Sequence, residues 1–433
     1  MNSLQINIDR HTELLAFFDN LKEKLVSNIQ ILALRPKLVS DVASSFTGDF
    51  DFIIRKKDVY PALYLIYDFC KNSGVNFTLH QAYKNKRIFK FFTSASENRC
   101  ITLELWTAIE FTQTGVTKSF ASDAIFDAID AKHVSATELL ALIYITHLHH
   151  KKKNIFSEEN IYRFAVFTKS LHNTENLLNI GETATLLQAI GNRELPLETA
   201  NENALQLIRK IGLKASNSLV KDSAYFLFRL NRKIFNLTKI VPVVGPDGVG
   251  KGSVSDQALA KLENWVSFRY KALYRIRKVY KARKLLIRNY NNKPDNMLDE
   301  QINHYILFTS YLTIRLLPLV KKEKRILLDR YFLDYLATPI RYLDEGANPR
   351  RIPFYGTMLR LTPTPNSMVF MGCKTSSLAE RKNELPVVSI DFLQHLYCEF
   401  ILKKRIPVVL FLSTENEIKI SSEALARFLN SSN

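Results

Sequence analysis

The chain has few cysteines, and none is placed to form a metal or disulfide motif. Cys70, Cys100, Cys373 and Cys398 lie far apart, without a Cys-x-x-Cys pair. This spacing argues against a zinc knuckle or a disulfide framework and fits a reducing cytoplasm. The first residues, 1–5, lack the basic start and apolar core of a secretory signal peptide, so none is expected.

Long apolar runs are also missing. The nearest candidate, residues 305–320, is interrupted by Thr309, Ser310, Thr313 and Arg315. A membrane-spanning helix needs about 20 predominantly apolar residues, so no transmembrane segment is predicted. The sequence has no internal repeat and no low-complexity tract either.

Acidic residues are outnumbered by basic ones. The 433 residues include 60 Lys and Arg against 42 Asp and Glu, which gives a net charge of +18. Such an excess indicates a polyanionic partner, an acidic substrate or an anionic membrane surface, without choosing among them. The hydrophobic content of 46% is ample for packed cores, and the length predicts two or three domains.

The most informative segment is 241–253, Val-Pro-Val-Val-Gly-Pro-Asp-Gly-Val-Gly-Lys-Gly-Ser. It is typical of a buried strand, a glycine-rich turn and the start of a helix, an arrangement that aims backbone N–H groups at a phosphate. The apolar strand favours this interpretation over an ordinary glycine-rich turn. Lys251 would reach the β- and γ-phosphates of ATP, and Ser253 would offer its hydroxyl to Mg²⁺. The predicted nucleotide-binding residues are Gly245, Asp247, Gly248, Gly250, Lys251, Gly252 and Ser253.

Two later segments place charged residues after predicted strands. Residues 325–331, Arg-Ile-Leu-Leu-Asp-Arg-Tyr, predict a strand that ends near Asp329, and functional residues gather at the carboxyl ends of parallel strands. Asp329 would hold Mg²⁺ or orient an acceptor hydroxyl and Arg330 would clamp a phosphoryl group, unless both simply form ion pairs at the strand end. Further on, Arg381 and Lys382 follow a strand predicted at 367–372. They suit a lid that brings positive charge to the phosphoryl group, or else a solvated helix surface.

The order of these motifs resembles the thymidylate kinase-like branch of P-loop kinases, over about residues 237–433. The resemblance implies a three-layer parallel-sheet kinase domain with ATP and Mg²⁺ as cofactors. It also implies that Lys251 and Arg381 stabilise the transferred charge, and that Arg330 faces the acceptor. Together with Asp329, these are the predicted catalytic residues.

A basic strip at 264–293 departs from that pattern, with ten Lys or Arg and no Asp or Glu. A thymidylate kinase does not need such a strip, and divergent members of this branch occur in bacterial surface-polysaccharide gene sets. The resemblance therefore favours a phosphorylated sugar or a glycan over a nucleoside monophosphate as acceptor. Single-stranded nucleic acid, a helix on an anionic membrane surface, and a solvated helix of a mobile cover stay open for the strip.

Acidic residues near the N-terminus indicate a second site. Asp49 and Asp51 are two residues apart on a predicted strand and so share one side of it, where they could bind divalent ions. Glu104, on a strand predicted at 100–106, is the candidate third ligand. The pattern resembles the nucleotidyltransferase fold over about residues 25–110, although a Gly-Ser pair is missing upstream and Glu104 replaces the more usual Asp. Exposed acids entering a strand, or a non-catalytic relative, are the alternatives.

The expected fold class is therefore α/β, in three parts. A nucleotidyltransferase-like domain at 1–130 precedes a helical region and linker at 131–235 and the P-loop kinase domain at 236–433. In the helical region, Ser135 or Thr137 is a predicted N-cap and Pro196 an interruption.

The histidines His147, His149 and His150 are expected to end a helix rather than to bind a metal. For the whole chain, phosphotransfer from ATP to a small or glycan-linked acceptor is the leading function. Nucleotidyl transfer through the N-terminal acids and a non-catalytic, nucleotide-gated binding role are the alternatives.

Overall fold

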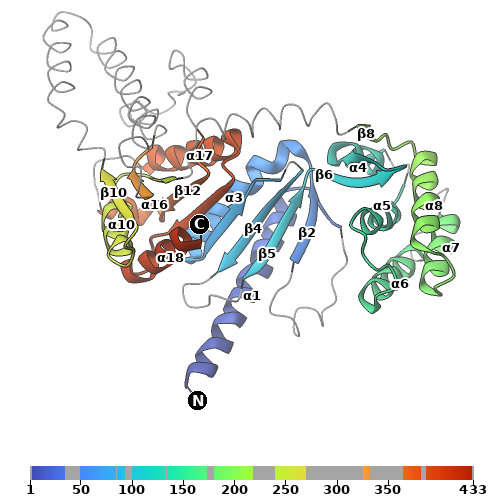
Figure 1. Cartoon of the computed structure of the whole chain (residues 1–433), viewed down its shortest axis with the longest axis horizontal. Helices are drawn as coiled ribbons and strands as arrows, with labels where there is room; N and C mark the ends of the chain where they lie inside the picture. The colour runs from blue at the N-terminus through green and yellow to red at the C-terminus, as the bar shows by residue number, and fades with distance from the viewer. Residues whose placement is uncertain are drawn as a thin grey trace, which may run out of the picture.

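The computed structural model describes residues 2–34, 49–83, 85–92, 100–131, 134–172, 180–217, 239–269, 325–331, 364–381 and 387–431 (Figure 1). In this part of the chain a ten-stranded sheet runs in the order β1-β2-β5-β4-β3-β13-β12-β9-β11-β10. Its N-terminal strands are β1 (Ile31–Ala33), β2 (Asp49–Ile54), β3 (Asn76–His80), β4 (Lys86–Phe92) and β5 (Ile101–Trp106). Its C-terminal strands are β9 (Ile240–Val244), β10 (Trp265–Arg269), β11 (Arg325–Asp329), β12 (Ser367–Gly372) and β13 (Val408–Ser413).

The C-terminal strands are all parallel to one another and are covered on both faces. Ile240 and Val244 of β9 pack in one hydrophobic core, while Val241 and Val243 pack in another on the opposite face. The helices α1 (Asn2–Asn28), α3 (Val59–Ser73) and α17 (Val387–Lys404) contribute to the first core, and α10 (Lys251–Leu259) and α18 (Ile418–Ser431) to the second. Burial on both faces explains why these strands are almost wholly apolar. The three-layer arrangement predicted for this half is therefore present.

The N-terminal strands continue the same sheet, because β3 pairs antiparallel with β13. Phe77 and Phe411 lie opposite each other at this seam with their rings stacked 4.3 Å apart. The side chain of Asn76 accepts a hydrogen bond from Ser413 N at 2.9 Å, and Gln81 donates to the carbonyls of Ile401 and Ile406. Strands β1 to β5 of the first predicted domain thus share one sheet and one core with the C-terminal half of the chain.

The middle of the chain forms a separate helical unit with its own core (Figure 1, right). It contains α4 (Ser122–Asp130), α5 (Ala136–His150), α6 (Glu158–His172), α7 (Ile180–Gly191) and α8 (Leu197–Lys210), with a small sheet of β6 (Ala108–Gln113), β7 (Val116–Ala121) and β8 (Ser216–Asn217). Three expectations are confirmed here: Ser135 caps α5 by accepting from Glu138 N at 3.0 Å, α5 ends at His150, and α8 begins after Pro196. The β6–β7 hairpin was not predicted.

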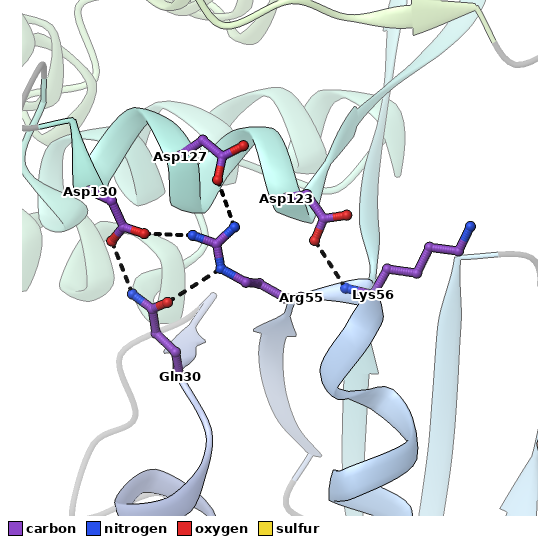
Figure 2. A network of polar contacts seen from close by, with 6 residues as sticks. All are labelled: Gln30, Arg55, Lys56, Asp123, Asp127 and Asp130. Carbon is purple, nitrogen blue, oxygen red and sulfur yellow. Dashed lines mark hydrogen bonds and ion pairs between the residues drawn. The ribbon is translucent and has the colours of Figure 1, made fainter. Parts of the chain in front are cut away.

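A polar network fastens the helical unit to the sheet (Figure 2). Arg55, just after β2, forms ion pairs with Asp127 at 2.7 Å and Asp130 at 2.6 Å on α4, and its guanidinium lies over the Phe126 ring. The hydrogen bond to Asp127 is the largest cause of the raised pKa of Arg55. Gln30 bonds to both Arg55 and Asp130 and closes the network.

The basic strip lies mostly outside the described residues. Its residues 265–269 form strand β10, which pairs with β11, so the helical alternatives left open for the strip do not hold for these residues. Residues 270–293, the candidate apolar run at 305–320 and Lys382 are outside the described part. Within that part, no helix combines the length and apolarity required to cross a membrane.

Candidate phosphate-binding site

The glycine-rich loop connects β9 to α10, as predicted. A Cβ on Gly245 would lie 2.3 Å from the carbonyl oxygen of Met371, so no side chain fits at this position. Gly248 and Gly250 have φ values of 88° and 89°, in the left-handed region that favours glycine. Gly250 is the N-cap of α10, and the helix begins at Lys251. The backbone conformation therefore requires glycine at these three positions. The N-terminus of α10 points at the loop, and the partial positive charge of a helix N-terminus favours an anion there.

Lys251 is buried beneath this loop. Its Nζ donates to the carbonyls of Gly245 at 2.6 Å and Pro246 at 2.9 Å, and lies 3.7 Å from Oδ1 of Asp247. Arg330 reaches the same Oδ1 from the end of β11, at 2.9 Å. The structure thus brings together three of the predicted residues, with two cations on one carboxylate.

Arg330 adopts an unusual backbone conformation that aims it at the loop. Its φ of 76° is in the left-handed region, which is uncommon for a residue other than glycine. Its N–H donates to the carbonyl of Val243 on β9 at 3.0 Å. Strained residues of this kind cluster at functional sites, so the conformation supports a role for Arg330 at the loop.

The oxygen donors near the loop fit Mg²⁺. Ser253 is exposed on the first turn of α10, and the half-buried Asp329 ends β11, in register with Val243. A hydroxyl and a carboxylate are hard oxygen ligands, and Mg²⁺ commonly takes only one or two ligands from the protein and the rest from phosphates and water. Arg381 is further along the sheet edge, at the end of α16 (Thr375–Arg381), where it donates to the carbonyl of Thr414 at 3.2 Å.

The N-terminal acids face a different cavity, of about 330 Å³, between the sheet and helices α5 and α6. Asp51 and Glu104 are register partners on β2 and β5, and Asp51 accepts from Nε1 of Trp106 at 3.3 Å. Lys86 on β4 binds both carboxylate oxygens of Glu104, at 2.8 and 2.9 Å. Burial and the nearby Asp51 raise the pKa of Glu104, and the ion pair with Lys86 opposes that rise.

The other wall of this cavity is mainly basic. Lys151, Lys153 and Arg163 line it from the end of α5 and from α6, together with Glu159, which forms an ion pair with Arg163. In the described residues, no group of three His, Cys, Asp or Glu side chains is placed to hold a metal ion. The three acids line one cavity, but they do not form the predicted three-ligand metal set, and Glu104 is bound by Lys86. Neither Lys86 nor the basic wall was predicted, because only strand pairing and helix packing bring them to the acids.

Comparisons with known proteins give distant structural neighbours only. No protein-family model and no curated protein matches the chain. Among solved structures, thymidylate kinase from Candida albicans is 15% identical with a TM-score of 0.33, over 44% of this chain and 91% of that one. Deoxyadenosine kinase from M. mycoides is 18% identical in two structures, one with dCMP and dCDP and one with dCTP. The TM-scores are 0.31 and 0.29, each over 44% of this chain and 99% of the other. Identities and TM-scores this low carry no functional argument, so the function is argued from the geometry of the loop.

Proposed function

We propose that the protein is an ATP-dependent phosphotransferase whose active site is the loop between β9 and α10. The observation that carries the proposal is the convergence of Lys251 and Arg330 on Asp247, which belongs to a loop whose glycines lead into the N-terminus of a helix. A buried lysine beside backbone N–H groups is suited to the β- and γ-phosphates of a nucleotide. An arginine from the neighbouring strand adds a second cation for a transferring phosphoryl group.

In this mechanism the side chains position charges and do little covalent chemistry. An acceptor oxygen forms a bond to the γ-phosphorus while the bond from that phosphorus to ADP breaks, and ADP keeps the electron pair. Lys251, Arg330 and, from the lid, Arg381 would stabilise the charge on the transferring oxygens. Ser253 and Asp329 would hold Mg²⁺, which neutralises phosphate charge when it is bound.

The proposed acceptor is anionic, and the candidates are a phosphorylated sugar, a glycan carrying phosphate, or a nucleoside monophosphate. Arg330 supports this choice, since a guanidinium at the end of β11 binds planar or tetrahedral oxyanions through paired hydrogen bonds. The excess of 60 basic over 42 acidic residues supports it further. A role in surface-polysaccharide synthesis follows if the acceptor is a sugar or glycan.

The proposal is tested by replacing Lys251 with Met, which keeps the buried alkyl stem and removes the ammonium group. Lys261→Met is the matched control, because Lys261 follows the same helix but pairs with Glu423 on the protein surface. ATP binding by calorimetry and phosphate transfer from γ-labelled ATP to a panel of acceptors would be measured. We expect loss of both in Lys251→Met and wild-type values in Lys261→Met. ATP binding that is the same in all three proteins would overturn the proposal.

Nucleotidyl transfer is a second candidate function, favoured by the cavity that holds acids on one wall and Lys151, Lys153 and Arg163 on the other. The basic wall would bind phosphates while the acids face the reacting end of the ligand. This cavity is five strand positions from β9 in the sheet order, about 24 Å away, so the two sites can be assayed separately.

The double variant Asp49→Asn and Asp51→Asn separates the two functions. If the cavity transfers nucleotides, this variant loses release of pyrophosphate from nucleoside triphosphates and keeps the activity that depends on Lys251. If the double variant matches wild type in every assay, the cavity is a binding module or a structural remnant. If neither site supports turnover but Lys251→Met still abolishes ATP binding, the protein is a nucleotide-gated binding protein.

A further inference from the structure

Helix α3 belongs to the N-terminal half of the chain, and it contacts strand β12, which supports the phosphate-binding loop. Tyr67 is 3% exposed, and its ring stacks on Phe370 of β12 with centroids 4.8 Å apart. Its hydroxyl packs against Gly372 at the end of the strand, where a Cβ would lie only 1.9 Å from Tyr67 Oη. The neighbouring residue on β12, Met371, is the one whose carbonyl excludes a Cβ from Gly245 of the loop. The carboxyl end of β12 thus contacts Tyr67 at one residue and the loop at the preceding one.

A second path leads from Tyr67 to the loop through α17. Tyr67 Oη donates a short hydrogen bond to Oε1 of Gln394, which is fully buried. Tyr397, one helical turn further on, packs against Phe370 at 5.2 Å and donates from its hydroxyl to the carbonyl of Gly245 at 3.4 Å. That same carbonyl accepts from Nζ of Lys251 at 2.6 Å. Two buried tyrosines therefore connect helix α3 with the carbonyl of Gly245, which accepts the hydrogen bond from Lys251.

We propose that Tyr67 and Tyr397 are positioning residues for the phosphate-binding loop, so that helix α3 of the N-terminal half contributes to the geometry of the phosphotransfer site. The inference rests on the proposed function. A buried carbonyl keeps its place when its hydrogen-bond partners are fixed, and both the lysine and the loop N–H groups depend on the position of Gly245. Tyr397 acts on Gly245 directly, and Tyr67 acts by holding Gln394 and the end of β12.

The test compares Tyr67→Phe and Tyr397→Phe with Tyr60→Phe. Tyr60 also lies on α3 and its hydroxyl contacts α17, at 2.9 Å from Nδ1 of His395 and 3.2 Å from the His395 carbonyl, and neither of those bonds involves a residue of the loop. Each of the three variants loses one hydroxyl from a tyrosine on α3 or α17. Dissociation constants and KM for ATP, kcat, KM for the best acceptor, and melting temperature would be measured in each.

We expect Tyr67→Phe and Tyr397→Phe to weaken ATP binding about threefold to tenfold, as the loss of one or two net hydrogen bonds predicts, with KM for ATP rising more than kcat falls. The KM for the acceptor should stay within twofold, and Tyr60→Phe should match wild type in every kinetic value. Amide exchange of residues 245–252, measured without nucleotide, should speed up in the first two variants only.

The outcomes separate this inference from the proposed function. If wild type binds ATP and Lys251→Met does not, but Tyr67→Phe and Tyr397→Phe behave as Tyr60→Phe does in ATP affinity and loop exchange, the positioning role is overturned while the phosphotransferase stands. If all variants including Lys251→Met bind ATP alike, the proposed function fails and this inference fails with it.

Discussion

At the scale of single residues, the carboxylate of Asp247 occupies the place where the cations of the loop meet. It lies 2.9 Å from Arg330 and 3.7 Å from Lys251, and only 16% of its side chain is exposed. A phosphate group would interact with the same two cations and would be repelled by the carboxylate. We therefore expect Asp247 to moderate the affinity of the loop for anions while it keeps the two cations in position.

Replacing Asp247 with Asn should tighten the binding of inorganic tripolyphosphate by about tenfold, the equivalent of about 1.4 kcal/mol. Tripolyphosphate is the suitable probe because it tests the loop without the nucleoside. Asp256→Asn is the control, because Asp256 is an exposed acid on helix α10, which follows the loop, and this variant should bind as wild type does. Calorimetry at fixed salt would measure both, and weaker binding in Asp247→Asn would show that the carboxylate organises the loop more than it repels the ligand.

The buried side chain of His80 is expected to make the stability of the protein depend on pH. Burial on β3, with a smaller contribution from Lys90, lowers its pKa from 6.5 to about 4. Between these values the unfolded chain binds a proton at His80 that the folded chain does not, so stability falls as the pH drops from 6.5 towards 4. His80→Gln should lose less melting temperature than wild type between pH 7 and pH 5. Equal slopes in the two proteins would show that His80 takes no part in acid unfolding.

At the scale of elements, the cap at the start of helix α5 helps to position the other end of the helix, which lines the cavity with the N-terminal acids. The helix carries His147 and Leu148, which line the cavity with the N-terminal acids, and the cavity continues along Lys151 after the helix ends. Its start is set by the hydroxyl of Ser135, which satisfies the N–H of Glu138. The hydrophobic core of the helical unit then holds the helix through its fully buried residues Leu139, Leu142 and Ile143.

Ser135→Ala should destabilise the protein by about 1 kcal/mol, because the helix loses its capping acceptor. Ser135→Asp should restore most of that loss, since a carboxylate can accept the same bond and also favours the N-terminus of a helix. Urea unfolding followed by circular dichroism would measure both. No difference between the Ala and Asp variants would show that the cap is dispensable in this context.

Local elements of this structure could be predicted from the sequence, and contacts between distant segments could not. The glycine-rich loop, strand β12 and the cap at Ser135 could be predicted because each depends on residues a few positions apart. The ion pair of Lys86 with Glu104 and the contact of Tyr67 with Gly372 could not, because they depend on which strands pair and which helices cover them. The hairpin at 108–121 was missed although Thr114 and Gly115, with φ of 49° and 76°, make the kind of two-residue turn that joins paired strands.

At the scale of the whole molecule, one sheet joins the two halves of the chain. Removal of the N-terminal half would uncover the hydrogen-bonding edge of β13, which pairs with β3 over residues 408–411. It would also uncover Phe411 and Phe370, which pack against Phe77 and Tyr67. Unpaired strand edges with exposed apolar side chains promote association between chains.

A fragment of residues 236–433 should therefore form soluble oligomers or aggregates when expressed alone. Co-expression with residues 1–217 should restore a well-defined complex, because the partner strand and its apolar face would be supplied in trans. Size-exclusion chromatography with light scattering would measure the masses of both samples. A monomeric fragment that unfolds cooperatively would show that residues 236–433 form an independent domain.

The seam between β3 and β13 has a consequence for synthesis on the ribosome. Val408, the partner of His80, is translated about 330 residues after it. At elongation rates of about 5 to 20 residues per second, β3 waits roughly 15 to 65 s before its partner leaves the exit tunnel. During that interval Phe77 and Leu79 lack their pairing partners Phe411 and Val409 on β13. The nascent chain is thus a candidate client for ribosome-associated chaperones, and the last strand to emerge completes the fold of the first half.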